Sequence, residues 1–268
     1  MRICFLIGLF ILGACLGSFL CCEARRLYLK GKEKLGPRSV CLSCKTKLKW
    51  YDNIPIFSWL FLRGKCRKCS KKIGALEFLS ELGVGLAFLC LGTTFDPFNT
   101  VALDWPIFII TLILTLILCF LAIYDGMCGE LPLIFLFLAI IFSLVLVVLK
   151  IFYQLQTTEF SVELILKPLV SAIIIGGLYL ILHFISRGKW VGDGDWLLGL
   201  SIGLALFEPY LSAVALFTAN VVACLVMLPF LKKSKHKKIY FGPFMVLAFV
   251  LTLTFSDFFL YALGGFVL

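Results

Sequence analysis

The sequence predicts an all-α, polytopic membrane protein of about eight transmembrane helices, with a small cytoplasmic zinc-ribbon-like insertion after the first helix. Three observations lead to this fold class. Apolar residues make up 62% of the 268 residues. Apolar stretches of the roughly 20 residues that cross a bilayer core recur along the chain. A basic segment with two Cys-x-x-Cys pairs separates the first two of these stretches.

The expected spans follow one another with short connections. They are residues 3–22, 76–94, 105–124, 131–153, 164–186, 196–207, 210–231 and 241–266. The stretch 196–207 is short, so we expect a half-span or a tilted, buried helix there. Residues 3–22 lead into a basic segment without an A-x-A cleavage signature, which favours a retained first span over a signal peptide.

The positive charges orient these spans. Lys and Arg gather in residues 23–72, at Arg187 and Lys189, and in residues 232–238. A topology that places these segments in the cytoplasm holds 22 of the 25 Lys and Arg on that side, as the positive-inside rule requires. Membrane topology and contact with the lipid bilayer therefore account for the net charge of +10, and no nucleic-acid partner is implied.

The division that follows has three parts. Residues 1–22 form the first transmembrane helix, residues 23–75 a cytoplasmic four-cysteine domain, and residues 76–268 a membrane-embedded domain. In the cytoplasmic part, four cysteines stand as two Cys-x-x-Cys pairs, namely Cys41, Cys44, Cys66 and Cys69. This pattern is typical of structural Zn²⁺ sites, which four thiolates close completely. Two disulfides or four free thiols are the alternatives, and a reducing cytoplasm disfavours disulfides.

Two carboxylates stand at the ends of apolar stretches. Asp125 ends the stretch 105–124, and Asp195 follows Gly192 and Gly194 just before the stretch 196–207. The expected topology puts both near the inner membrane surface, where a pair of carboxylates could act as acid and base in aspartyl proteolysis. The simpler readings are an N-cap for Asp195 and an interfacial acid for Asp125.

Several motifs resemble those of one family, the type IV prepilin peptidases, which are leader peptidases and N-methyltransferases. The similar segments are Gly17-Ser18-Phe19-Leu20, Pro37-Arg38-Ser39 with the first cysteine pair, Trp50-Tyr51-Asp52-Asn53-Ile54-Pro55, Ser58-Trp59-Leu60, Arg63-Gly64-Lys65-Cys66-Arg67 with Cys69, Asp125 with Leu131-Pro132, Gly192-Asp193-Gly194-Asp195 and Phe241-Gly242-Pro243-Phe244. The resemblance covers most of the chain and keeps the order of the motifs.

The resemblance implies a function and a set of site residues. Asp125 and Asp195 would be the catalytic pair, and Asp193 would occupy the variable position of the motif. Gly192, Gly194, Gly242 and Pro243 could let a peptide backbone approach, or could simply form helix-entry turns. Glu81, in a Glu-Leu pair similar to the family's, could position a basic leader. With Glu77 it could instead form a surface acidic pair.

The implied substrates are prepilins or pseudopilins, cut at the cytoplasmic face of a bacterial inner membrane. The new N-terminus would then be methylated with S-adenosylmethionine. No G-x-G-x-x-G fingerprint is present, so methylation rests on the resemblance alone.

Three positions depart from the family pattern, namely Cys21, Leu133 and Leu197. They leave substrate positioning open and remove no catalytic carboxylate. Two other functions fit part of the sequence. One is an intramembrane aspartyl protease that acts on other substrates, and the other is a non-enzymatic, zinc-binding membrane scaffold. His183 is isolated in its stretch, and we expect it to be a packed residue rather than a catalytic one.

Overall fold

Helices form most of the described chain in the computed structural model, which divides into two units, Met1–Gly92 and Thr93–Leu268. The structure describes residues 1–29, 39–41, 43–96, 102–156, 159–188, 191–231 and 240–264. The Pro37-Arg38 pair, Lys189 and the basic cluster at 232–238 lie outside these residues. Across the described ranges the only extended pairing is two isolated β-bridges.

In the first unit, two long helices pack through small residues. Its elements are α1 (Arg2–Leu29), the 3-10 helix η1 (Trp50–Asn53), α2 (Phe57–Phe61) and α3 (Ala75–Thr94). A Cβ atom on Gly17 would lie 2.5 Å from the backbone oxygen of Ser80. The backbones of α1 and α3 thus approach as closely as only glycine allows, which is common for paired helices in membranes.

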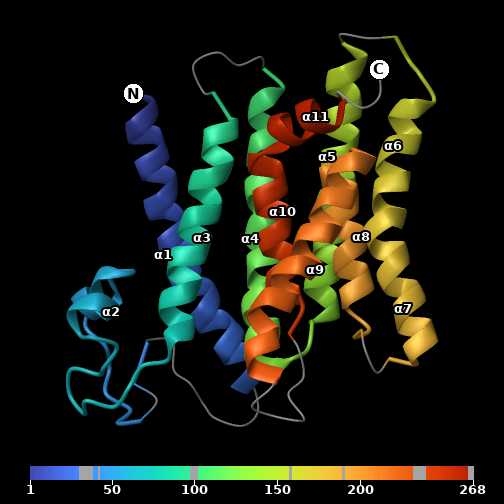
Figure 1. The fold of residues 1–268 in the computed structure, drawn as a ribbon. Coiled ribbons are helices and arrows are strands. Elements are labelled where there is room, and N and C mark those ends of the chain that lie inside the picture. Colours follow the sequence, from blue (N-terminus) through green and yellow to red (C-terminus); the bar gives the residue numbers. More distant parts are fainter. Residues whose placement is uncertain are drawn as a thin grey trace. The chain divides into compact units, whose positions relative to one another are not determined.

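The second unit is a bundle of helices (Figure 1). Its elements are α4 (Asp104–Cys128), α5 (Leu133–Leu155), α6 (Glu163–Ala172), the π-helical turn η2 (Ile173–Gly177), α7 (Leu178–Ser186), α8 (Asp195–Leu206), α9 (Pro209–Leu231), α10 (Gly242–Thr254) and α11 (Ser256–Gly264). The segments α6, η2 and α7 form one continuous span of 24 residues. Large apolar side chains such as Phe137 and Phe217 are exposed on the bundle, as expected for faces that contact lipid.

The predicted fold class is confirmed. Six helices of the described chain are long and apolar enough to cross a membrane, and α10 with α11 makes a seventh if a bend of 74° is allowed within one span. The one remaining expected stretch, 196–207, is α8, a helix of 12 residues. At a rise of 1.5 Å per residue it is about 18 Å long, too short to cross a bilayer core of about 30 Å.

The short helix α8 is held inside the second unit. It packs against α5, α6, α10 and the turn η2, and nine of its residues are buried. Three side chains from neighbouring helices donate hydrogen bonds to carbonyl groups in its last turns. Ser143 Oγ donates to Ser201 O at 2.8 Å, Lys150 Nζ to Ala205 O at 2.8 Å, and Ser171 Oγ to Phe207 O at 3.0 Å. These bonds satisfy polar backbone groups that lipid could not.

Glycine permits the close packing of α8 against its neighbours. A Cβ atom on Gly203 would lie 2.4 Å from the backbone oxygen of Ser171 in α6, and one on Gly176 in η2 would lie 2.9 Å from Leu200 Cα. Both contacts are with backbone atoms, which cannot rotate away. The position of α8 therefore depends on the absence of side chains at these two sites.

We predict that Gly203→Ala destabilises the second unit, because the added methyl group must push α6 and α8 apart. Overpacking of this kind costs about 1–3 kcal/mol, which corresponds to several degrees in the melting temperature of the detergent-solubilised protein. Gly83→Ala is the matched control, because a Cβ atom there meets nothing within 4 Å. An unchanged melting temperature for Gly203→Ala would contradict the packing described here.

Candidate active site and cysteine cluster

Asp125 lies in the last turn of α4 and is 6% exposed. Its Oδ2 accepts a hydrogen bond of 2.9 Å from the backbone N–H of Gly242, the first residue of α10. A Cβ atom on Gly242 would lie 2.9 Å from the same oxygen, so glycine is needed for this contact. Gly129 ends α4 in the left-handed conformation, and its N–H bonds the backbone oxygen of Asp125 at 2.7 Å. This is a common helix C-cap.

Asp195 is the first residue of α8 and is half-buried. Its Oδ2 accepts the backbone N–H of Gly192 at 2.9 Å. The carboxylate therefore bonds a residue that precedes the helix, and it does not cap the free N–H groups of α8. The simpler reading as an N-cap does not describe this geometry.

The helices bring the two carboxylates toward each other. α10 packs against both α4 and α8, and α5 packs against the same two helices. Asp195 lies within electrostatic range of Asp125. Two carboxylates separated by 70 residues in the sequence thus share one environment within the second unit.

The glycines of the loop before α8 serve different purposes. A Cβ atom on Gly194 would lie 2.7 Å from Leu131 Cβ, so this glycine lets the loop pack against the segment before α5. Gly192 is exposed, and a Cβ atom there would be in ordinary contact with Asp195 at 3.4 Å. Pro243 stands in the first turn of α10, 4.0 Å from the Cβ position of Gly126. The predicted access for a peptide backbone stays a prediction.

His183 contacts two residues of the loop before α8, Val191 and Asp193. His183 Nδ1 lies 3.0 Å from Val191 O, and its Nε2 lies 3.3 Å from Asp193 Oδ1. The side chain of Asp193 is 91% exposed, whereas Asp195 faces the protein. His183 thus contacts the loop that leads to Asp195.

The second unit also contains a polar pair, Tyr179 and Asn220, that the sequence does not predict. Tyr179 in α7 is 3% exposed and lies within electrostatic range of Asp195. Its hydroxyl accepts a hydrogen bond of 3.2 Å from Asn220 Nδ2 in α9, and its ring packs edge-on against Phe241 at 5.3 Å. In the sequence, Tyr179 and Asn220 stand out only as polar residues within two apolar stretches. Nothing in the sequence indicates that the two side chains contact each other.

The four predicted cysteines come together. Their sulfur atoms lie within 4.8 Å of one another, and the Sγ atoms of Cys41 and Cys69 are 3.9 Å apart. Sulfur ligands about 2.3 Å from a tetrahedral metal are about 3.8 Å apart. The cluster could therefore hold a metal ion.

The two cysteine pairs fold in the same way. In the first knuckle, Cys41 N–H bonds Thr46 O at 2.9 Å and Lys45 N–H bonds Cys41 O at 2.8 Å. In the second, Cys66 and Ser70 repeat both bonds with Lys71 O and Cys66 O, each at 2.9 Å. Lys45 and Ser70, the equivalent residues, both have positive φ. Each turn thus presents its two thiols to the same point.

The thiols differ in acidity. A hydrogen bond with the Thr46 hydroxyl is the main cause that lowers the pKa of Cys44 to about 6. Backbone N–H groups of Cys69 and Lys68 lower the pKa of Cys66. The pKa of Cys69 is raised to about 11, because desolvation and the neighbouring thiols outweigh a hydrogen bond from the Lys71 backbone. A cation bound among these sulfur atoms would favour their thiolate forms.

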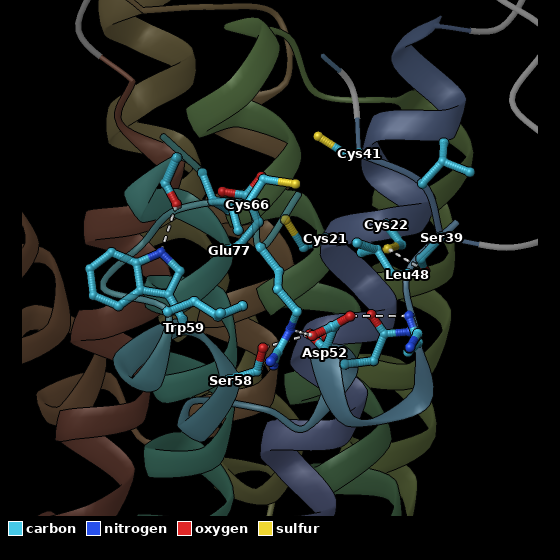
Figure 2. A pocket seen from close by; sticks show the side chains of 18 of the residues that line it. Cys21, Cys22, Ser39, Cys41, Leu48, Asp52, Ser58, Trp59, Cys66 and Glu77 are labelled. Carbon is cyan, nitrogen blue, oxygen red and sulfur yellow. Dashed lines mark hydrogen bonds and ion pairs between the residues drawn. The ribbon is translucent and has the colours of Figure 1, made fainter. Parts of the chain in front are cut away.

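Glu81 lies in α3 of the first unit. Its Oε2 accepts the backbone N–H of Ile56 at 2.6 Å. The neighbouring acid Glu77 forms an ion pair with Arg25 of α1. A cavity of about 920 Å³ opens between these acids and the cysteine segment. Figure 2 shows Cys21 and Cys22 of α1, Glu77 of α3, and Asp52, Trp59 and Cys66 around it.

Fold and site together define a multi-pass membrane protein with two carboxylates within electrostatic range of each other in one unit and a four-cysteine cluster in the other. Comparison with known proteins identifies its relatives. Residues 11–95 match the family described as Bacterial Peptidase A24 N-terminal domain. The chain is 46% identical over 88 residues to the Prepilin leader peptidase/N-methyltransferase of Myxococcus xanthus, which is 32% of this chain and 26% of that protein.

A longer alignment extends the relationship beyond the N-terminal part. The chain is 28% identical over 228 residues to the Prepilin leader peptidase/N-methyltransferase of Aeromonas hydrophila, covering 82% of this chain and 72% of that protein. The match to the protein of the same name from Vibrio cholerae is 35% identical and covers 29% of this chain and 36% of that protein. No solved structure matches the chain.

These matches confirm the resemblance to the type IV prepilin peptidases, to which the chain is similar. The alignments with the Myxococcus and Vibrio proteins span about a quarter and about a third of those proteins.

Proposed function

We propose that the chain is a membrane aspartyl endopeptidase that removes the basic leader of prepilin-like proteins. We place its activity at the cytoplasmic face of a bacterial inner membrane. The observation that carries the proposal is the pairing of Asp125 and Asp195 at the ends of α4 and α8. Each carboxylate is fixed by a backbone N–H, from Gly242 and Gly192 respectively. The names of the relatives support prepilins as the substrate class.

The two carboxylates have distinct roles in this proposal. Asp195 begins a helix, where the backbone dipoles favour an anion, and it acts as the base. Asp125 lies at a helix C-terminus and carries the proton. Asp195 takes a proton from water as the water oxygen attacks the scissile carbonyl carbon, and Asp125 donates its proton to the carbonyl oxygen. When the C–N bond breaks, Asp195 returns its proton to the leaving amine and Asp125 recovers one from the intermediate.

Asp125→Asn and Asp195→Asn should each lower leader cleavage by a factor of about 10³ or more, because each removes a proton-transfer group. The measurement is the mobility shift of a prepilin co-expressed with the chain. Asp193→Asn is the matched control, since its side chain is 91% exposed, and it should keep most of the cleavage.

Persistent cleavage in both dyad variants would reject the aspartyl mechanism. Cleavage of a general membrane substrate, with prepilins left intact, would favour an intramembrane protease of different specificity. No cleavage of any substrate by the native chain would favour a scaffold.

We further propose that the cysteine cluster binds one structural Zn²⁺. Four thiols supply a full tetrahedral set and leave no position for a reacting ligand. Cys41→Ser should lower the zinc content from about one ion per chain toward zero, as measured by elemental mass spectrometry of the purified protein. Cys224→Ser, an exposed cysteine of α9, should keep the metal. A native chain free of zinc and of other bound metal would contradict the assignment.

The third part of the proposal is methylation of the new N-terminus with S-adenosylmethionine as the methyl donor. Its support is the name shared by the relatives and the cavity in the unit that contains most of the matched family domain. Its volume of about 920 Å³ lies in the range of small-molecule sites. Mass spectrometry of a cleaved prepilin would show the added methyl group.

A further inference from the structure

One face of the short helix α2 is anchored to the rest of the first unit. Its second and third residues, Ser58 and Trp59, make the contacts (Figure 2). The Ser58 hydroxyl donates a hydrogen bond of 2.7 Å to Asp52 O. The Trp59 indole donates one of 3.3 Å to Gly74 O, and its ring stacks on Phe78 of α3 at 4.8 Å. These bonds fix α2 beside the first turns of α3 (Figure 1).

The opposite face of α2 is apolar and exposed. Phe57, Leu60 and Phe61 are spaced i, i+3 and i+4, so they share one side of the helix. Their exposed fractions are 61%, 51% and 84%. A soluble protein seldom leaves three adjoining large apolar side chains in water, and such a patch marks a site of interaction. The face therefore calls for an apolar partner.

The length of α3 places α2 at a particular depth in the membrane. α3 has 20 residues and is apolar enough to cross a bilayer. At 1.5 Å per residue it is about 30 Å long, which only just matches the hydrocarbon core, so its first residue lies at one edge of that core. Phe78, the fourth residue, then lies about 5 Å inside this edge. Because Trp59 stacks on Phe78, α2 lies at the boundary between headgroups and acyl chains, where Trp is enriched in membrane proteins.

A second contact supports this depth. The N–H of Ile56, just before α2, donates a hydrogen bond of 2.6 Å to Glu81 Oε2. Glu81 lies almost one turn deeper in α3 than Phe78. Both ends of the contact between α2 and α3 thus fall within the apolar length of α3, and not in the segment that precedes it.

Two lysines stand at the level of the headgroups. Lys65 and Lys72 face each other in an isolated antiparallel β-bridge, and both are exposed. Lys72 precedes the first residue of α3 by three positions, so its backbone lies within about 11 Å of the edge of the core. Like charges that face each other across such a pair repel. Phosphate groups of lipids at this level would offset the repulsion.

We propose that the first unit rests on the membrane through α2, with Phe57, Leu60 and Phe61 inserted among the lipids of the leaflet in which α3 begins. Lys65 and Lys72 contact the phosphate groups of the same lipids. Interfacial helices bury their apolar side chains about 5–10 Å into the boundary between headgroups and acyl chains, which is the depth that the contact with α3 gives α2. The inference does not depend on the proposed peptidase and methyltransferase reactions.

The apolar helix of a substrate protein is the competing occupant of this face. A prepilin-like substrate carries a basic leader in front of that helix, and Lys65 and Lys72 would repel the leader. A second copy of the chain would bring two further lysines to the same place. Lipid phosphates carry the opposite charge, so a lipid surface is the partner that fits both the apolar face and the lysines.

The test is the depth of a fluorine probe in the full chain, reconstituted in nanodiscs of phosphatidylglycerol and phosphatidylethanolamine. Trifluoromethylphenylalanine in place of Phe61 keeps the apolar character of the exposed ring. Its fluorine NMR signal should lose most of its intensity to a lipid with a nitroxide on the acyl chain, and little to a water-soluble gadolinium chelate. The same probe in place of Lys68, an exposed residue of the second cysteine pair, should lose its signal to gadolinium.

A charge on the same face should reverse the response of the probe. A carboxylate is costly at this depth, so Phe57→Asp should expose the probe at position 61 and make gadolinium the stronger quencher. Phe57→Leu keeps the face apolar and should leave both responses as they are in the native chain. The melting temperature of each variant reports whether it is folded.

Three results would overturn the proposal. Strong loss of the signal at position 61 to gadolinium in the chain without further changes would place the face in water. Protection from gadolinium that arises only when a prepilin is added would assign the face to a substrate. Protection from both quenchers would place the face against protein, within this chain or in a second copy.

Discussion

The structure of the second unit depends on how the backbone of α8 is satisfied. A helix of 12 residues ends before it can cross a bilayer, and its last carbonyl groups must find donors within the protein. Ser143 and Lys150 of α5 and Ser171 of α6 supply them, and Lys167 adds an ion pair of 2.9 Å to Glu208 just beyond the helix. With its C-terminal end anchored, α8 presents Asp195 at its other end as part of a rigid element.

The same principle, a polar group held by the backbone, organises the carboxylate pair. Asp125 and Asp195 are each bonded by one backbone N–H from a glycine, and in the proposed mechanism the second oxygen of each side chain is the one that exchanges protons. Rigid placement of catalytic groups is worth more than their mere presence, because a displacement of about 1 Å can cost a hundredfold in rate. Tyr179, held by Asn220, lies within electrostatic range of Asp195.

In the first unit, hydrogen bonds with the backbone likewise hold the cysteine cluster and the turn beside Glu81. The four thiols are presented by two knuckles with matching hydrogen bonds, and the loop before α2 is held in a strained turn by a carboxylate. The cavity of about 920 Å³ lies in this same unit, and the proteins that the chain matches carry a double name, leader peptidase and N-methyltransferase.

The sequence by itself determined the apolar spans, the four-cysteine pattern and the two carboxylates at span ends, because these depend on composition, charge and spacing along the chain. Only the tertiary structure decided which groups meet. The donors to the end of α8, the Tyr179–Asn220 pair and the convergence of Ser18, Ile56 and Glu81 join residues 25 to 63 positions apart. The bend of 74° between α10 and α11 likewise follows from packing, since the apolar stretch 241–266 reads as one continuous span.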